Sequence, residues 1–356
     1  MLFPYTYVPH SIEKLQEYID YLVLEVWCKA SGDFDIDKIG HADLKEIVLA
    51  IYYDNKITKD HLYGPIETIF NIFKTFNAAT KQNFAEGYRI NNNIEDLCKG
   101  VNACKPMLYY HIKGVNAVLE KELNAFFKNL FTDVIKLKVV INKIGEIDGH
   151  YDDFVSVNVV GKCPFCGIND IKGIYHTKRE AYDHYLPKDV YAFNAINFKN
   201  LAPMCHECNS SYKGVKDPLH RKSDGKRRKA FFPFDTTRPV NPTFTISLTN
   251  NNIAGLQPDE IDLKITATDC DEEIESWLEV FGIEERYKGR IIEQYGKYWF
   301  YTQLRDEYEN YPDAVKNIYT RGDKLINMIE SAETAPYIDL NFLKAAFLRE
   351  CQKICI

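Results

Sequence analysis

The chain has 356 residues, of which 46% are hydrophobic and 27% charged, and a net charge of −7 at pH 7. This length ordinarily corresponds to two or three domains, and the composition excludes both a disordered chain and a protein covered in basic surface. No run approaches the roughly 18 apolar residues of a membrane span, so we expect no membrane partner.

The start of the sequence, MLFPYTYVPHSIEKLQ, has no basic segment followed by an apolar stretch and a small-residue cleavage site. We therefore expect no signal peptide and a cytoplasmic location. In a reducing compartment, closely spaced cysteines favour metal binding over disulfide formation.

Residues 11 to about 147 repeat their apolar side chains at helical spacing. The clearest segments are SIEKLQEYIDYLVLEVW, ADLKEIVLAIYY, GPIETIFNIFKTF and NAVLEKELNAFFKNLFTDVIKL. The pattern breaks at SGDFD, YDNK, NNN and residues 100–106, which are rich in turn-forming residues. We predict a helical domain over residues 1–150.

Between about residues 155 and 234 the pattern changes to two Cys-x-x-Cys pairs, scattered Gly and Pro, and short extended runs. This composition is typical of a small module held together by a metal, which we assign to residues 151–235. Over residues 236–356, the alternating segments TFTISLTNNNIAGLQ and EIDLKITATD predict a short hairpin, and helical periodicity resumes at DEEIESWLEVF. The predicted fold class is α+β, with mostly helical domains flanking the small module.

Four cysteines form the strongest chemical signal in the sequence: Cys163, Cys166, Cys205 and Cys208. Each pair lies on a short loop that lets two sulfur atoms point to one centre, and four thiolates complete a tetrahedral zinc site. The 38 residues between the pairs exceed the spacing of an ordinary zinc ribbon, so they must house something substantial. The other cysteines are interpreted as small buried hydrophobes: Cys28, Cys98, Cys104, Cys270, Cys351 and Cys355.

An unusual polar set lies within and just after the paired cysteines: Asp183 with His184, then Asn200, then Asn209. In this order the segment resembles the HNH nucleases, also called ββα-metal or His-Me finger enzymes. The resemblance covers about 60 residues and rests on Asp183-His184, Asn200-Leu201 with Pro203 and Cys205, and Cys208-Asn209 with Lys213. It implies a metal-dependent endonuclease that cuts DNA, built on a ββα module, and it does not extend to the flanking helical domains.

Phosphodiester hydrolysis explains why these residue types occur together. His184 can accept a proton from water near neutral pH, and Asp183 and Asn209 offer oxygen ligands suited to magnesium or manganese. The resemblance implies that these residues are catalytic and that Asn200 holds the loop that aims the base. It also implies that Asn209 replaces the histidine often found at this position, so we expect weak binding of the catalytic metal.

Basic residues cluster from 213 to 229 and give this segment a net charge of +6, which leaves −13 for the rest of the chain. We predict that this basic strip lies along a nucleic-acid backbone, with salt-sensitive affinity and no base readout. The predicted contact residues are Lys213, Lys216, Arg221, Lys222, Lys226, Arg227, Arg228 and Lys229. A solvated loop is the alternative interpretation.

Each of these residues also has a purely structural interpretation. His184 is compatible with a half-buried strand position, Asn200 with a turn and Asn209 with a helix cap. Their joint occurrence favours the nuclease, and the main alternative is a zinc-stabilised nucleic-acid-binding module without catalysis. A RING-like interaction module ranks third because it needs more than four zinc ligands. Two further histidines, His176 and His206, are interpreted as surface or structural residues.

The extra helical domains suit a regulated nuclease better than a freely acting one, and the architecture resembles the HNH components of bacterial defence modules. The sequence contains no Walker-type glycine loop, so any nucleotide-driven step requires another protein, such as an ATPase. The expected partners are therefore DNA, a regulatory protein of this kind and, for a double-strand cut, a second copy of the chain.

Overall fold

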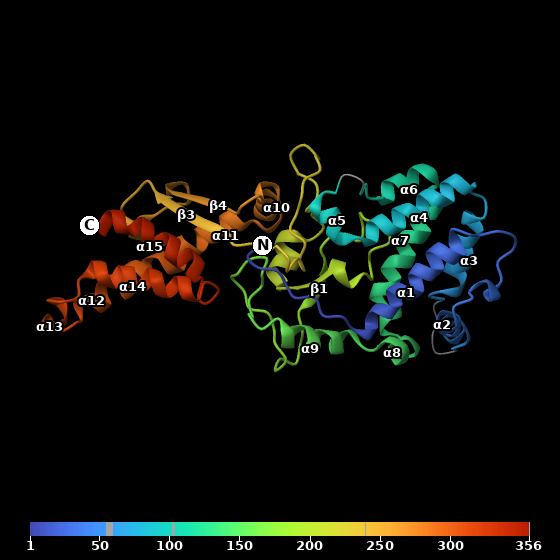
Figure 1. Ribbon diagram of the computed structural model, residues 1–356, viewed down its shortest axis with the longest axis horizontal. Coiled ribbons are helices and arrows are strands. Elements are labelled where there is room, and N and C mark those ends of the chain that lie inside the picture. The colour runs from blue at the N-terminus through green and yellow to red at the C-terminus, as the bar shows by residue number, and fades with distance from the viewer. Residues whose placement is uncertain (55–59, 102–103, 239, 356) are drawn as a thin grey trace.

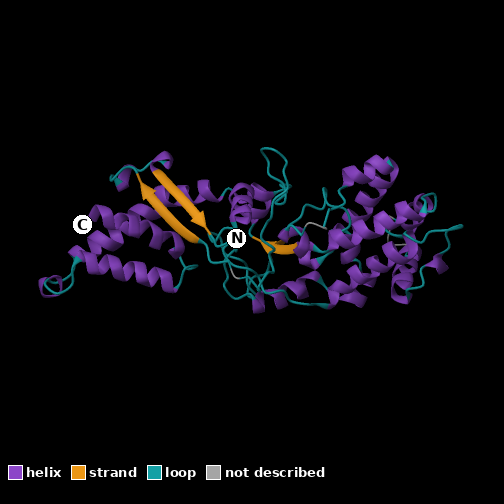
Figure 2. Cartoon of the chain, turned by 45° about the horizontal axis from the view of Figure 1, so that its top comes forward, coloured by secondary structure: helices purple, strands orange, loops and turns teal. Residues whose placement is uncertain are grey.

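The computed structural model describes residues 1–54, 60–101, 104–238 and 240–355. The molecule is elongated, with the N-terminal helices at one end, the C-terminal helices at the other and a small sheet near the middle (Figure 1). It is mostly helical, and within the described ranges the strands form two separate antiparallel pairs (Figure 2). The predicted mixture of many helices with little sheet is confirmed.

Helices fill the N-terminal region: α1 (Lys14–Tyr21), α2 (Ala42–Tyr53), α3 (Tyr63–Phe73), α4 (Ala78–Asn92), α5 (Ile94–Lys99), α6 (Tyr109–Val115), α7 (Ala117–Thr132), α8 (Lys138–Ile144) and α9 (Ile147–Val157). Side-chain caps start several of them, as where Asn116 Oδ1 accepts the Val118 and Leu119 N–H groups at the start of α7. The predicted break at NNN is the junction of α4 and α5, whereas YDNK falls partly outside the described residues. Helix α9 runs across the predicted domain boundary at residue 150.

Aromatic side chains fill the core of this region. Trp27 packs against Phe73 and Phe126, with ring centroids 6.3 and 5.2 Å apart. Phe127 packs at 5.4 Å against Phe193, which lies in the loop that joins the two strands of the central module. Burial of these apolar faces stabilises the helices, and the N-terminal region shares one continuous core with the centre of the molecule.

The central sheet consists of β1 (Ala181–His184) and β2 (Leu201–Met204), paired so that Asp183 lies opposite Ala202. Directly after β2 come the second cysteine pair and a π-helical segment, Glu207–Lys213, called here the 207–213 helix. Both faces of the sheet are covered, so nearly every strand residue is buried and neither strand alternates. The order of elements in this region is therefore strand, strand, helix.

The C-terminal region begins with a hairpin, as predicted, of β3 (Thr243–Leu248) and β4 (Ile261–Thr266). The helices that follow are α10 (Asp271–Phe281), α11 (Ile283–Arg290), α12 (Glu307–Glu309), α13 (Asp313–Lys316), α14 (Arg321–Thr334) and α15 (Asn341–Cys355), with π-helical segments at Ile291–Tyr295 and Tyr298–Asp306. Helix α15 packs on both α14 and β3. Among the described residues, no helix is both long and apolar enough to cross a membrane.

Candidate functional site

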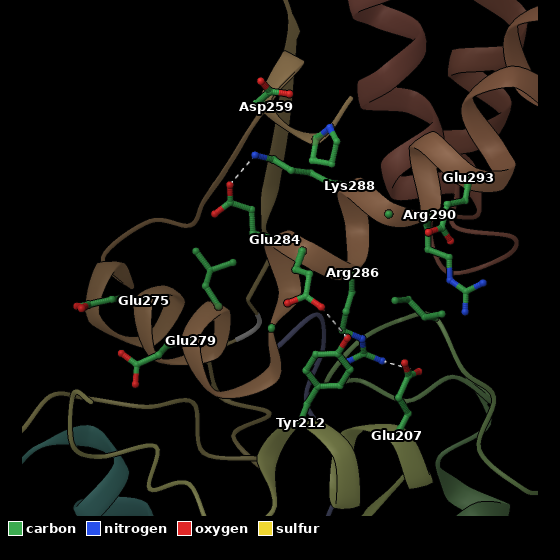
Figure 3. Close-up of a pocket in the computed structure, with 16 residues that line it drawn as sticks. Glu207, Tyr212, Asp259, Glu275, Glu279, Glu284, Arg286, Lys288, Arg290 and Glu293 are labelled. Carbon is green, nitrogen blue, oxygen red and sulfur yellow. Dashed lines mark hydrogen bonds and ion pairs between the residues drawn. The ribbon is translucent and has the colours of Figure 1, made fainter. Parts of the chain in front are cut away.

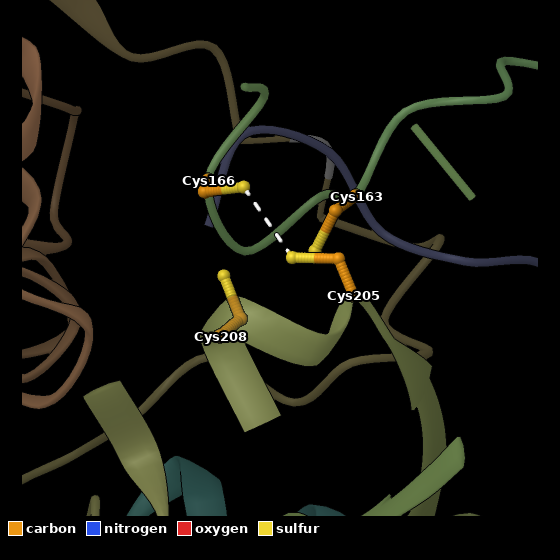
Figure 4. Close-up of side chains that lie close together, drawn as sticks. All are labelled: Cys163, Cys166, Cys205 and Cys208. Carbon is orange, nitrogen blue, oxygen red and sulfur yellow. Dashed lines mark hydrogen bonds between the residues drawn. The ribbon is translucent and has the colours of Figure 1, made fainter. Parts of the chain in front are cut away.

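Four buried cysteine side chains converge in the central module (Figure 4). Their sulfur atoms all lie within 4.8 Å of one another, and Cys166 Sγ is 3.9 Å from Cys205 Sγ. A disulfide would need about 2 Å, whereas thiolates at about 2.3 Å from a tetrahedral zinc ion are about 3.8 Å apart. The predicted set Cys163, Cys166, Cys205 and Cys208 therefore forms a cluster that fits a metal ion such as zinc.

Backbone and amide donors surround these sulfur atoms. The Gly167 N–H donates to the Cys163 carbonyl at 2.7 Å, and the positive φ of Gly167, +64°, turns the chain there. The Ile168 N–H lies 3.4 Å from Cys166 Sγ, and the Asn169 amide lies 3.5 Å from Cys205 Sγ. Donors directed at sulfur stabilise thiolates, which is the state that metal binding requires.

His184 ends β1, and its environment fixes which nitrogen carries the proton. Nε2 lies 2.8 Å from the Ala195 carbonyl oxygen, which can only accept, so Nδ1 keeps the lone pair of the neutral ring. Burial, followed by the nearby ammonium groups of Lys188 and Lys213, lowers the pKa of His184 to about 3 against the opposing effect of Ala195. Phe131 of α7 packs edge-on against the imidazole at 4.6 Å. The ring is thus neutral at pH 7 and held in one orientation.

The loop that supplies the Ala195 carbonyl is anchored by the N-terminal helices. Phe193 adopts φ +76°, which costs a residue with a side chain about 1 kcal/mol or more. Its ring is buried against Phe127 of α7, and the Asn91 amide of α4 donates to the Ala192 carbonyl at 2.7 Å. These contacts offset the conformational strain of the turn that directs the Ala195 carbonyl at His184.

Asn200 is fully buried behind the same loop. Its Oδ1 accepts the Leu186 N–H at 2.8 Å, and its Nδ2 donates to the Leu186 carbonyl at 2.9 Å and to the Asn194 carbonyl at 3.5 Å. Leu186 lies two residues after His184, and Asn194 directly precedes Ala195. The amide therefore ties together the two segments that position the imidazole, which is the arrangement that the predicted loop-holding role requires.

Asp183 is only 5% exposed, and the ammonium group of Lys213 lies 2.9 Å from its Oδ2. The same ammonium group also donates to the His184 carbonyl at 2.9 Å. Burial raises the pKa of Asp183, and Lys213 acts in the opposite direction. Lys213 offsets the negative charge of this buried carboxylate, whose oxygen atoms are also the type of ligand that Mg²⁺ and Mn²⁺ prefer.

A cavity of about 290 Å³ brings three predicted site residues into one space: Asp183, His184 and Asn209. Asn209 is half-buried and directly follows Cys208 on the 207–213 helix, so the cysteine cluster fixes its backbone. Asn200 supports the cavity from behind and does not line it. Lys188 also lines the cavity, and no hydrogen bond or ion pair of the described residues engages its ammonium group.

Two residues of the basic strip were wrongly predicted to contact a phosphate backbone. Lys213 is 1% exposed and forms an ion pair with Asp183. Arg228 is 2% exposed and forms an ion pair with Glu279 of α10 at 3.1 Å. Charge alone could not reveal this, because the carboxylates that neutralise these cations come from elements distant in the sequence. A buried cation requires such partners.

The rest of the basic strip forms a hairpin closed by a bridge between His220 and Arg227. Arg221 is half-buried on Glu275 of α10, and Arg227 donates to the backbone of residues 97 and 104. The remaining predicted cations are exposed at Lys216, Lys222, Lys226 and Lys229. Arg221 and Arg227 therefore fix the hairpin to the rest of the protein, while the four lysines are exposed.

The other histidines and cysteines lie away from these sites. His176 and His206 are exposed, and His176 Nδ1 accepts the Gly173 N–H at 3.1 Å. The remaining described cysteine side chains are buried at Cys98, Cys270 and Cys351 and half-buried at Cys28 and Cys104. The side chain of Cys355 lies outside the described residues.

Sequence reasoning missed three groups that hold the His184 imidazole in place: the Phe131 ring, Phe193 and the Ala195 carbonyl. It also missed Lys188, although this lysine lies only four residues after His184. Comparison with protein-family models, curated proteins and solved structures finds no match.

Proposed function

We propose that this chain is a metal-dependent endonuclease of the HNH type that hydrolyses DNA phosphodiester bonds. The proposal rests mainly on the tautomer and the position of the His184 imidazole. Its proton is held on Nε2 by the Ala195 carbonyl, and the unprotonated Nδ1 belongs to a ring that lines a cavity together with Asp183 and Asn209. A base beside two oxygen ligands is the minimum that hydrolysis of a phosphodiester needs.

In this proposal His184 accepts a proton from water as the water oxygen attacks phosphorus. The bond from phosphorus to the leaving oxygen breaks, and that oxygen takes a proton from solvent. Asp183 and Asn209 would hold Mg²⁺ or Mn²⁺, which when bound offsets the negative charge on the phosphate and the leaving oxygen. Asn200 keeps the imidazole aimed, and Lys188 supplies a cation that faces the phosphate in place of the buried Lys213.

The four-cysteine cluster holds zinc as a structural centre in the proposed enzyme, and four sulfur ligands leave no open position for substrate. The exposed part of the basic hairpin contacts the DNA backbone. Phosphate contacts of this kind fix the position of the duplex without reading its bases.

Cleavage of supercoiled plasmid in Mg²⁺ or Mn²⁺ tests the proposal. The wild type is compared with His184→Ala and with the matched control His176→Ala, whose histidine is exposed and lies outside the cavity. We expect slow, metal-dependent nicking by the isolated wild type and the control, and a loss of about 100-fold or more in His184→Ala. Zinc content is measured in all three proteins, so that loss of the base is separated from loss of the fold.

The alternative is a zinc-stabilised nucleic-acid-binding module without catalysis. Such a module has no use for a carboxylate and an oriented imidazole that line the same cavity, which favours the enzyme. DNA binding by zinc-loaded wild type that is equal in His184→Ala, with no cleavage by either protein, would support the alternative.

We further propose that the enzyme acts in the cytoplasm in bacterial defence and is controlled by a partner such as an ATPase. The helical regions on both sides of the central module offer surfaces for such a partner. High cleavage activity of the isolated chain, without a partner or trigger, would contradict this part of the proposal.

A further inference from the structure

A cavity of about 1080 Å³ lies between the 207–213 helix and helices α10 and α11 (Figure 3). It is separate from the cavity that contains His184. Where α11 meets the 207–213 helix, Arg286, Tyr212 and Glu207 lie together. At this point the C-terminal region reaches the cysteine cluster.

Arg286 of α11 is 6% exposed and directs its charge at that cluster. Nη1 lies 3.2 Å from Cys208 Sγ, Nη2 lies 3.0 Å from a Glu207 carboxylate oxygen, and the guanidinium stacks 4.4 Å above the Tyr212 ring. Its Nε is buried without a hydrogen bond, so burial of this side chain is costly.

The anions near Arg286 indicate what offsets that cost. The side chain of Glu207 is 38% exposed, so solvent weakens its attraction for the guanidinium. A neutral thiol is a weak acceptor, whereas four thiolates around a divalent ion carry a net charge of −2. The position of Arg286 therefore fits a metal-loaded, anionic cluster.

Two further buried donors from the same helices reach the loop of the first cysteine pair. Trp277 Nε1 of α10 donates to the Phe165 carbonyl at 2.7 Å, and the Tyr287 hydroxyl of α11 donates to the Cys166 carbonyl at 2.8 Å. Phe165 also stacks on Phe281 at 5.2 Å. Both cysteine loops are thus held from the C-terminal region.

The turn between α10 and α11 is shaped for this contact. Gly282 has φ +58°, and a Cβ atom at this position would collide with the Tyr212 ring. Only glycine allows both the left-handed turn and this approach to the 207–213 helix. The contact is therefore built into the backbone.

We propose that the metal centre fastens the C-terminal region to the central module. Arg286 donates to the metal-bound Cys208 thiolate, and Trp277 and Tyr287 hold the carbonyls of the other cysteine loop. By linkage, loss of the metal loosens this junction, and loss of Arg286 weakens retention of the metal. The inference goes beyond nuclease activity and does not depend on it.

The first experiment uses full-length, zinc-loaded protein with Arg286→Met and the matched control Arg290→Met. Arg290 lines the same cavity but makes its hydrogen bond to Gln294. We expect transfer of zinc to a chromogenic chelator to be about tenfold faster in Arg286→Met and unchanged in the control. In the cobalt-substituted proteins, the thiolate-to-metal charge-transfer absorption should move to lower energy only in Arg286→Met. Equal rates and equal spectra for the three proteins would overturn the proposal, as would a wild type that binds neither metal.

A second experiment needs no variant and stands even if Arg286→Met fails to fold. Hydrogen exchange of the wild type is compared with zinc bound and after chelation. We expect amides of α10 and α11 to lose protection by more than about tenfold, while α3 and the packed pair α14 and α15 keep theirs. Unchanged exchange in α10 and α11 after removal of zinc would overturn the proposal.

Discussion

The cysteine cluster and the cavity around His184 lie close in sequence and differ in nearly every property that decides how a metal is held. The cluster offers four sulfur atoms, is fully buried and is enclosed by amide donors and by Arg286. The cavity offers oxygen atoms of Asp183 and Asn209 beside an open space. A closed set of soft ligands suits a permanent structural ion, whereas an open set of hard ligands suits an ion that exchanges with water.

One short helix joins the two sites. Cys208 and Asn209 are consecutive residues of the 207–213 helix. Lys213 lies about one turn later on this helix and forms an ion pair with Asp183. Disruption of the closed site should therefore disrupt the open one, whereas disruption of the open site should leave the closed one intact. Substitutions at each site test this asymmetry.

Cys163→Ser should produce the largest effect, because it removes one of four thiolates from a buried site. We expect loss of bound zinc and a decrease in the free energy of unfolding on the order of 5 kcal/mol, together with loss of any cleavage activity. Zinc content and thermal unfolding measure this. Cys28→Ser is the control and should cost about 1 kcal/mol or less with zinc retained. A Cys163→Ser protein that keeps one zinc at wild-type stability would contradict the structural role of the cluster.

Lys213→Met should reduce the free energy of unfolding by about 3 kcal/mol, because it leaves the buried Asp183 carboxylate without its cation. Zinc should remain bound. Mg²⁺ should stabilise this variant more than it stabilises the wild type, since the open site then lacks its internal cation. Thermal unfolding with and without Mg²⁺ measures both effects. Lys216→Met, on the exposed part of the strip, should show neither, and an identical Mg²⁺ response in all three proteins would argue against a metal at Asp183.

Asn200→Ala should cost about 2 kcal/mol, because it leaves the buried N–H and carbonyl of Leu186 without partners. Cleavage should fall by at least about tenfold while zinc is retained. Urea unfolding and plasmid nicking measure the two quantities. Asn197 lies on the same loop as Asn200 and donates to the Asn92 carbonyl, so Asn197→Ala breaks a comparable contact. This variant should lose a similar amount of stability and keep most of the activity. Equal activity in the two variants would show that Asn200 has no special role in aiming His184.

Lys222→Gln combined with Lys226→Gln should produce the smallest effect, on DNA affinity alone. Both side chains are exposed on the hairpin, and Lys226 Nζ lies 3.5 Å from an Asp224 carboxylate oxygen. We expect the affinity for DNA to weaken by about tenfold. The slope of log affinity against log salt concentration should decrease by an amount that corresponds to about two phosphate contacts. Fluorescence anisotropy at several salt concentrations, with Ca²⁺ in place of Mg²⁺, measures this. Unchanged affinity would move the DNA interface away from the hairpin.

The features that sequence predicts well depend on local chemistry. The Cys-x-x-Cys loops define the cluster without knowledge of the fold, and the alternation in residues 261–266 predicts β4 because only one of its faces is buried. Strands β1 and β2 are four residues long and buried on both faces, so their sequences carry no period.

The features that sequence misses depend on contacts between distant segments. Lys213 is indistinguishable from its exposed neighbours until the fold places Asp183 beside it. The Ala195 carbonyl is a backbone group with no sequence signature, and the Phe131 ring belongs to a helix that ends about 50 residues before His184. The contact between Arg286 and Cys208 joins residues 78 positions apart. A resemblance confined to about 60 residues cannot contain such partners.

The strained turn at Phe193 bears on how this fold could be reused. A segment cut out at residues 151–235 and transplanted into another protein would carry its cysteines and its histidine but leave behind α4 and α7, which hold that turn. The imidazole would then lose both the ring that packs on it and the support of its carbonyl partner. For protein engineering, a graft must therefore include α4 and α7 together with the central module, or replace the contacts that these helices make.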